Sequence, residues 1–175
     1  QNSVFGVILI LSIYLFLRRH TVWAVISMVF AAIMHSAYLI HAGLLTISYL
    51  TVLLRETKSV KKPVQLGLFA LALVSPVLWY NLVFLDSTSQ EIFQKYMYIM
   101  THIRIPHHSL PSVWLDTSEY LKLGVMIAGL YLVRKSDLFI VLLIPFLAGT
   151  VLTVAQVLTG SDAIAYFAPW RVSVF

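Results

Sequence analysis

The sequence contains no cysteine and few charged residues for its length. Without cysteine, neither a disulfide framework nor a thiolate metal site is possible. Charged residues make up only 11% of the 175 residues, whereas hydrophobic residues make up 60% and the mean hydropathy is +0.90. This composition lies far outside the range of soluble domains and indicates an integral membrane protein.

The sequence also lacks an initiator methionine, and its charges follow neither the pattern expected of a signal peptide nor that of a nucleic-acid-binding protein. It begins with Gln1, and residues 169–175 resemble the start of another apolar segment, so we expect 1–175 to be a single transmembrane domain fragment. Arg18 and Arg19 follow the first apolar stretch, whereas a signal peptide has its positive charges first. The twelve Lys and Arg stand in short clusters between apolar runs, which is typical of membrane-surface loops and excludes nucleic acid as the expected partner.

Apolar runs long enough to cross a bilayer occupy most of the chain. A helix needs about 20 residues to cross the hydrocarbon core. The run 21–54 is too long for one span, so we expect two helices folded against each other, with a break near His35, Ser36 or His41 to Gly43. The predicted fold is an all-α, polytopic transmembrane helix bundle of about six spans plus a truncated one. The spans are 3–17, two within 21–54, 64–84, 120–133 and 138–158, with the stub at 169–175.

The Lys and Arg residues predict how these spans are oriented. If successive loops alternate sides, eight of the twelve fall on one side, which is expected to be cytoplasmic because positive residues are retained there. These eight are Arg18, Arg19, Arg55, Lys58, Lys61, Lys62, Arg134 and Lys135. The outer face then carries the long loop 85–119, the loop 159–168 and the turn near residues 35–41. It would hold five of the seven acidic residues and every histidine except His20.

Within the long outer loop, the sequence predicts a short helix followed by an extended segment. Thr88-Ser-Gln-Glu91 has the form of a capping box, and apolar residues then recur at helical spacing to about Thr101. We therefore expect a short amphipathic helix from about Gln90 to Thr101. Pro106 and Pro111 disfavour helical geometry at their neighbours, so the segment after that helix is expected to be an ordered, extended loop.

This proline-containing segment holds most of the candidate functional residues. His107 or His108 is suited to general acid or base chemistry, with Asp116 or Glu119 to orient it. Arg104 is suited to binding an anionic group such as a lipid phosphate. Three alternatives stay open: a metal site formed by His102, His107 and His108 with a carboxylate, a lid over a lipid-substrate groove, and a polar loop with no chemical role.

Five further residues are candidates for substrate binding on the same face. His102 lies in the same loop, and Trp114 falls near the predicted membrane boundary. His35 and His41 lie inside an apolar run, where a histidine is costly unless it faces the bundle interior or water. Each is either a hydrogen-bonded core residue or part of the site. Arg171 either extends its charge to the membrane surface or binds an anion.

Two stretches of this sequence resemble known membrane proteins. The residues Arg104-Ile-Pro-His-His-Ser-Leu-Pro-Ser-Val-Trp114, with Ala168-Pro-Trp-Arg-Val172, resemble a family of bacterial multi-pass membrane proteins known only as a domain of unknown function. The layout also looks like GT-C-class envelope glycosyltransferases and like O-antigen ligase or polymerase proteins. The likeness to GT-C glycosyltransferases implies sugar transfer from a polyprenyl-phosphate donor. The likeness to O-antigen ligases implies a lipid-linked pyrophosphate handled by Arg104 and by His107 or His108.

The sequence thus predicts a multi-pass protein of the bacterial inner membrane that acts on a lipid-linked or envelope substrate at its outer face. A glycan-transfer enzyme is the favoured hypothesis. Membrane lipids and a polyprenyl-phosphate-linked glycan are the expected partners, and no cofactor is identified. The alternative is a transporter or a non-catalytic membrane scaffold, which would place ionisable groups near the bilayer midplane.

Overall fold

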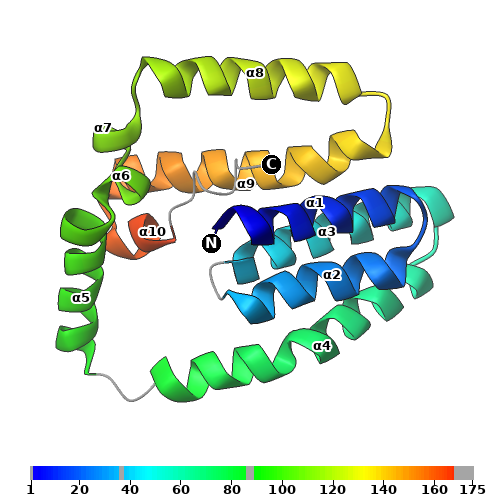
Figure 1. Ribbon diagram of the computed structural model, residues 1–175, viewed down its shortest axis with the longest axis horizontal. Coiled ribbons are helices and arrows are strands. Elements are labelled where there is room, and N and C mark those ends of the chain that lie inside the picture. The colour runs from blue at the N-terminus through cyan, green and yellow to red at the C-terminus, as the bar shows by residue number, and fades with distance from the viewer. Residues whose placement is uncertain (1, 36–37, 86–88, 168–175) are drawn as a thin grey trace. The chain divides into compact units, whose positions relative to one another are not determined.

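The computed structural model describes residues 2–35, 38–85 and 89–167, and these residues form ten α-helices and one π-helix (Figure 1). They divide into two compact units. Unit 1 contains the residues up to 85 and the segment 135–145, and unit 2 contains the segment 86–134 and the residues from 146 onward. The all-α fold class is confirmed. The predicted stub at 169–175, including Arg171, lies outside the described residues.

Unit 1 is built mainly from four consecutive helices that run antiparallel to one another along the chain (Figure 1). They are α1 (Asn2–Leu17), α2 (Thr21–Met34), α3 (Leu39–Thr57) and α4 (Lys61–Leu85). Helix α2 packs against α1, α3 and α4, and α3 also packs against α4. The prediction that residues 21–54 form two helices folded against each other is therefore confirmed, with the break between Met34 and Leu39.

The turn between α1 and α2 is closed by an arginine in a left-handed conformation. Arg19 has φ 69°, and its N–H donates to the carbonyl of Phe16 while the next N–H, of His20, donates to the carbonyl of Leu15, both at 2.9 Å. This pair of bonds is a Schellman motif, which satisfies carbonyls at the end of a helix. A non-glycine residue in this region costs about 1 kcal/mol. Lys58, with φ 49°, ends α3 in the same region.

A buried polar contact joins the first three helices. The ring of Tyr49 stacks on that of Phe16, with centroids 4.0 Å apart, and neither residue is more than 1% exposed. The Tyr49 hydroxyl is 2.8 Å from the hydroxyl of Ser12, which donates at 2.7 Å to the carbonyl of Ala24. Tyr49 thus packs and hydrogen-bonds in the same place, and every polar atom in the contact has a partner.

A proline interrupts α4, and a serine compensates for it. Pro76 has no N–H, so the carbonyl of Ala72, four residues earlier, receives no bond from it. The hydroxyl of Ser75 donates to that carbonyl at 2.9 Å. In a membrane, such side-chain donors are what make a proline tolerable inside a helix.

The same arrangement occurs at the proline in α9 (Asp137–Thr159). Pro145 leaves the carbonyl of Val141 without its usual donor. Ser48 of α3 lies with its hydroxyl 3.5 Å from that carbonyl and 2.9 Å from the carbonyl of Leu44. The Ser48 hydroxyl has only one proton to donate. It therefore bonds more strongly to the nearer carbonyl, of Leu44, and more weakly to the carbonyl of Val141. The contact ties α3 to the part of α9 that belongs to unit 1.

Three of the described helices are long and apolar enough to cross a membrane: α3, α4 and α9. Two further apolar segments, 6–17 and 21–34, are shorter, and α8 (Thr117–Val133) has 17 residues. The structure therefore supports three candidate spans, and the predicted number of about six is not shown. Large apolar side chains on α4, such as Leu68 and Trp79, are 60% and 72% exposed, which suits a helix that faces lipid.

Unit 2 consists of short helices and two longer ones. The short elements are α5 (Gln90–Tyr98), the π-helix η2 (Ile99–Arg104), α6 (Pro106–Ser109), α7 (Pro111–Trp114) and α10 (Asp162–Tyr166). The longer ones are α8 and the part of α9 from residue 146. Helix α5 runs directly into η2, and both pack against α10. The predicted outer loop is thus a series of helical turns.

Two sequence predictions for this loop need correction. The helix predicted from Gln90 does begin there, but its N-cap is Ser89, whose hydroxyl accepts a bond from the N–H of Ile92, and not a capping box starting at Thr88. The segment after it is not extended, because Pro106 and Pro111 each occupy the first position of a helical turn. Proline suits that position, since its missing N–H would have no helical partner there and its φ is already helical.

We expect the hydroxyl of Ser75 to stabilise the protein only when Pro76 is present. Ser75→Ala should lower the free energy of unfolding by about 1 kcal/mol, measured by circular dichroism during unfolding in mixed detergent micelles. In a Pro76→Ala background the Ala72 carbonyl regains a backbone donor, so the same change should cost much less. An equal cost of Ser75→Ala in both backgrounds would show that the hydroxyl does not compensate for the proline.

The absence of cysteine allows the sidedness of α4 to be tested with single introduced thiols. Ser59→Cys, before α4, and Ser112→Cys, after it, are both at exposed positions. A membrane-impermeant maleimide should label the second in intact spheroplasts and the first only after lysis. Labelling of both thiols from the same side would contradict a crossing by α4.

Candidate functional site

A histidine and an aspartate from distant parts of the sequence form the best-defined polar contact of unit 2. His102 Nε2 lies 2.7 Å from Asp162 Oδ1, and both side chains are about one-third exposed. The ring of Tyr98 stacks on the ring of His102, with centroids 4.5 Å apart. An imidazole held in this way by a carboxylate has a fixed orientation, so its other ring nitrogen is directed to one place.

The local sequence explains why Asp162 reaches His102. Helix α9 ends at Gly160, whose φ of +63° is a conformation that favours glycine, and whose N–H donates to the carbonyl of Gln156 at 2.8 Å. Ser161 then caps α10 by accepting a bond from the N–H of Ile164. These two turns place Asp162 in the first turn of a short helix that packs on η2.

On the other side of the pair, η2 positions His102. Its π-type geometry closes with a bond from the N–H of Ile105 to the carbonyl of Met100, at 2.8 Å. Thr101 is fully buried, and its hydroxyl donates to the carbonyl of Met97 at 2.9 Å and lies 3.4 Å from Asp162 Oδ1. Buried Thr101 thus fixes the helix next to the exposed His102. Such π-segments are common at functional sites.

Two tyrosines make a second link between α5 and α10. The hydroxyls of Tyr96 and Tyr166 are 3.2 Å apart, and their rings meet edge to face. Burial and, to a smaller extent, the hydrogen bond with Tyr96 together raise the pKa of Tyr166 to about 12. Tyr166 is therefore a neutral hydrogen-bonding group at physiological pH.

The two histidines predicted to be catalytic occupy the next helical turn. His107 and His108 lie in α6 with their ring centroids 4.1 Å apart and the ring planes inclined by 50°. His107 is exposed, whereas Ser109, directly after His108, is 1% exposed and its hydroxyl has no hydrogen-bond partner within the described ranges. A buried hydroxyl without a hydrogen-bond partner is unusual in a folded protein, so this turn belongs among the candidate functional elements.

The structure places the remaining predicted residues of unit 2 as follows. Arg104 is the last residue of η2 and is exposed, and Trp114 is the last residue of α7 and is half-buried. Asp116 is the N-cap of α8, accepting a bond from the N–H of Glu119 at 3.0 Å. Glu119 also forms an ion pair with Lys122. Both carboxylates thus make their hydrogen bonds and ion pairs in the first turns of α8.

His35 and His41 belong to unit 1, where they share an aromatic neighbour. The ring of Tyr38 lies 5.7 Å from that of His35 and 5.3 Å from that of His41. His35 is the C-cap of α2 and His41 is in the first turn of α3, so both lie at the turn between these helices. The two histidines therefore lie together at one end of unit 1.

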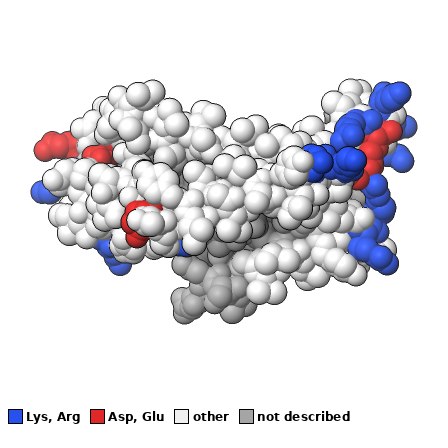
Figure 2. All heavy atoms as spheres, turned by 90° about the horizontal axis from the view of Figure 1, so that it is seen from above, with Lys and Arg blue, Asp and Glu red and all other residues white. Residues whose placement is uncertain are grey.

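The opposite end of unit 1 carries all of its charged residues. Arg19 forms an ion pair with Glu56 at the end of α3 and with Asp137 at the start of α9, the latter at 3.1 Å. The hydrogen bond with Glu56 is the main reason that the pKa of Arg19 is raised above its usual value. In the described part of unit 1, this end holds seven basic and two acidic residues. Figure 2 shows Lys and Arg gathered in a dense group with acidic residues among them.

The described residues contain no group of three or more His, Asp or Glu side chains placed to hold a metal ion. The described residues therefore give no support to the hypothesis that His102, His107 and His108 bind a metal ion together. Comparison with protein-family models, with curated proteins and with solved structures finds no match to this chain.

Asp162 is the residue that the sequence prediction missed. It was expected on the outer face but was not assigned to a site, because 60 residues separate it from His102. The available signal was the sequence Gly160-Ser-Asp162 directly after an apolar helix, which is typical of a turn followed by a new helix start. That signal predicts where Asp162 lies along the chain and not what it contacts.

We expect His102 and Asp162 to stabilise the contact between η2 and α10 jointly. His102→Gln and Asp162→Asn should each speed trypsin cleavage after Arg104 about three- to fivefold, which corresponds to the 0.5–1 kcal/mol of a partly exposed pair. The double variant should be cleaved no faster than either single one. His107→Gln is the matched control and should leave the rate unchanged. Additive effects of the two changes would show that the residues act separately.

Proposed function

We propose that this chain is an integral protein of the bacterial inner membrane that transfers a glycan from a lipid-linked phosphate donor. The reaction takes place at the segment between α4 and α8, which the Lys and Arg count assigns to the outer face. The observation that carries the proposal is the contact of His102 with Asp162, 2.7 Å long and open to water on one side.

His102 is the general base of the proposed reaction. It takes the proton from an acceptor hydroxyl as that oxygen bonds to the anomeric carbon of the sugar. The bond between this carbon and the phosphate oxygen breaks, and the lipid phosphate leaves with the electron pair. Asp162 orients the imidazole and stabilises the imidazolium that forms.

The leaving phosphate needs a cationic partner, and Arg104 fits that role. It is exposed at the end of η2, two residues after His102, and its planar guanidinium can donate two parallel hydrogen bonds to phosphate oxygens. His107 and His108, in the turn that follows, supply further donors for the sugar or the phosphate. Helices η2 and α6 pack against each other, so one substrate headgroup is within reach of both.

The substrate arrives in the membrane, and the fold suits that supply. Three helices are long and apolar enough to cross a bilayer, and the short elements η2, α6 and α10 carry the polar site residues. This division between apolar spans and a polar helical segment supports chemistry at the water–membrane boundary. It favours an enzyme over a transporter, whose ionisable groups would line the middle of the spans.

The proposal is tested with the full chain in proteoliposomes that contain a polyprenyl-phosphate-linked fluorescent glycan and a sugar acceptor. His102→Ala and Arg104→Ala should each lower the release of polyprenyl phosphate at least 100-fold, because general-base and charge-stabilising groups contribute effects of that order. His20→Ala, at the basic end of unit 1, is the control and should retain full turnover. Absence of turnover in the unaltered protein, or full activity of His102→Ala, would overturn the proposal.

A further inference from the structure

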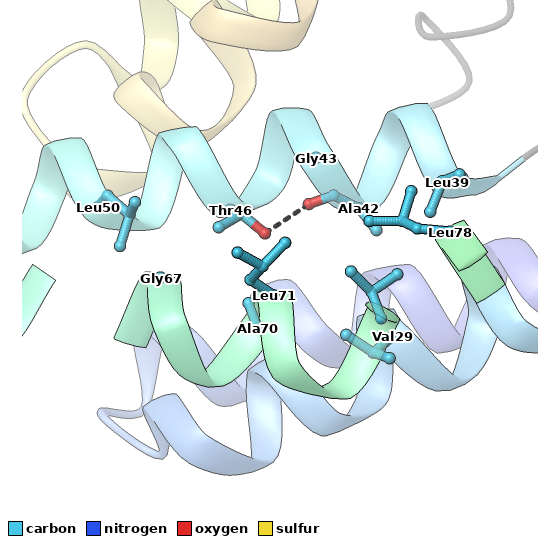
Figure 3. A pocket seen from close by; sticks show the side chains of 11 residues that line it. Val29, Leu39, Ala42, Gly43, Thr46, Leu50, Gly67, Ala70, Leu71 and Leu78 are labelled. Carbon is cyan, nitrogen blue, oxygen red and sulfur yellow. Dashed lines mark hydrogen bonds between the residues drawn. The ribbon is translucent and has the colours of Figure 1, made fainter. Parts of the chain in front are cut away.

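Unit 1 contains an apolar groove between α3 and α4, shown in Figure 3. Its volume is about 360 Å³, within the range of sites that bind small molecules. The groove is lined by hydrocarbon along both helices, with residues that include Leu39, Ala42, Gly43, Gly67, Ala70 and Leu71. Both helices are long and apolar enough to cross a membrane, so the groove lies at the depth of the lipid chains.

Small residues explain why the groove is open. The two helices approach closely at Gly67, where an added Cβ would lie 3.3 Å from a methyl of Leu50. At Gly43 an added Cβ would meet nothing within 4 Å, so space remains between the helices there. The one hydroxyl in the lining belongs to Thr46 and donates at 2.7 Å to the carbonyl of Ala42, as Figure 3 shows. The groove therefore offers a ligand dispersion contacts alone.

A second hollow, a cleft of about 450 Å³, lies nearer to the charged end of the same helices. On α3 the cleft is lined between Leu53 and Thr57 and the groove between Leu39 and Leu50. On α4 the cleft lining begins at Lys62 and the groove lining at Gly67. The two hollows thus follow each other along α4. At the cleft, polar and charged side chains join the apolar ones, namely those of Arg19, Glu56, Thr57, Lys62 and Gln65.

The cleft lining holds two basic residues, Arg19 and Lys62, and one acidic residue, Glu56. Both acidic residues of this end, Glu56 and Asp137, are engaged by Arg19. The other basic residues of the end are therefore in excess, and Lys62 is the one that lines the cleft together with Arg19. A ligand seated here would gain most from a negative charge close to Lys62.

We propose that cleft and groove together form a binding site for an anionic glycerophospholipid. The headgroup phosphate binds in the cleft near Lys62 and Gln65, and one acyl chain lies in the groove past Gly43. The order of the two hollows along α4, polar at the helix end and apolar within the span, matches the order of the parts of such a lipid. The site is in unit 1 and does not depend on the proposed transfer reaction.

The headgroup contact is tested by native mass spectrometry of the full chain in detergent, titrated with phosphatidylglycerol or phosphatidylcholine. The unaltered protein should bind phosphatidylglycerol more tightly. Lys62→Gln should weaken its binding about fivefold, the effect of one basic residue near an anionic lipid, and should leave phosphatidylcholine unaffected. Lys61→Gln removes the same charge one position away, outside the cleft, and is the matched control. Equal binding of the two lipids, or equal effects of the two lysine changes, would overturn the proposal.

The acyl-chain contact is tested in the same experiment by filling the groove. Gly43→Leu places a side chain in the open space without a backbone clash and should weaken the binding of both lipids at least tenfold. Gly129→Leu makes the same change on α8, where nothing lies within 4 Å either, and should have no effect. Retained lipid binding in Gly43→Leu would show that no chain occupies the groove.

Discussion

The contact of Tyr49 with Phe16 and Ser12 holds the centre of unit 1 together. In a bilayer the hydrophobic effect does not bring helices together, because lipid chains are as apolar as leucine side chains. Close packing and a small number of hydrogen bonds must supply the association. The stacked rings supply the packing, and the chain of hydroxyls from Tyr49 through Ser12 to a carbonyl of α2 supplies the bonds. Three helices meet at one fully buried tyrosine.

Most other hydroxyls in the apolar helices bond within their own helix. Thr46, Thr150 and Thr153 each donate to the carbonyl four residues earlier, at 2.7 to 2.8 Å. These residues are thereby satisfied without a partner helix, as the absence of water in a bilayer demands. Hydroxyls that reach another helix, such as those of Ser12 and Ser48, occur where a tyrosine or a proline gives them a specific partner. The hydrogen bonds between helices are therefore few and local.

The sequence predicted the main features of the fold because they follow from composition and length. An apolar run twice as long as a bilayer requires must fold back, and α2 and α3 do so at the expected break. Local rules were less reliable in the polar loop, where Pro106 and Pro111 begin helical turns and do not hold an extended chain. Proline is compatible with both states, and only the surrounding packing selects between them.

The candidate site was predictable as a region and not as a set of contacts. The histidines and Arg104 stand out in the sequence because polar residues are scarce in this chain. The partner of His102 could not be found in the same way, since Asp162 comes from a turn beyond α9. Pairing across such a distance depends on how α5, η2 and α10 pack, and that is a tertiary property without a local pattern.

The Schellman turn at Arg19 has a consequence for biosynthesis. Glycine would adopt the left-handed conformation more readily, yet Arg19 and Lys58 occupy it at the two turns of the same end of unit 1. Cationic residues resist translocation across the membrane while the nascent helices insert. The two residues whose backbone ends these helices therefore also carry positive charges of the kind that orient membrane helices.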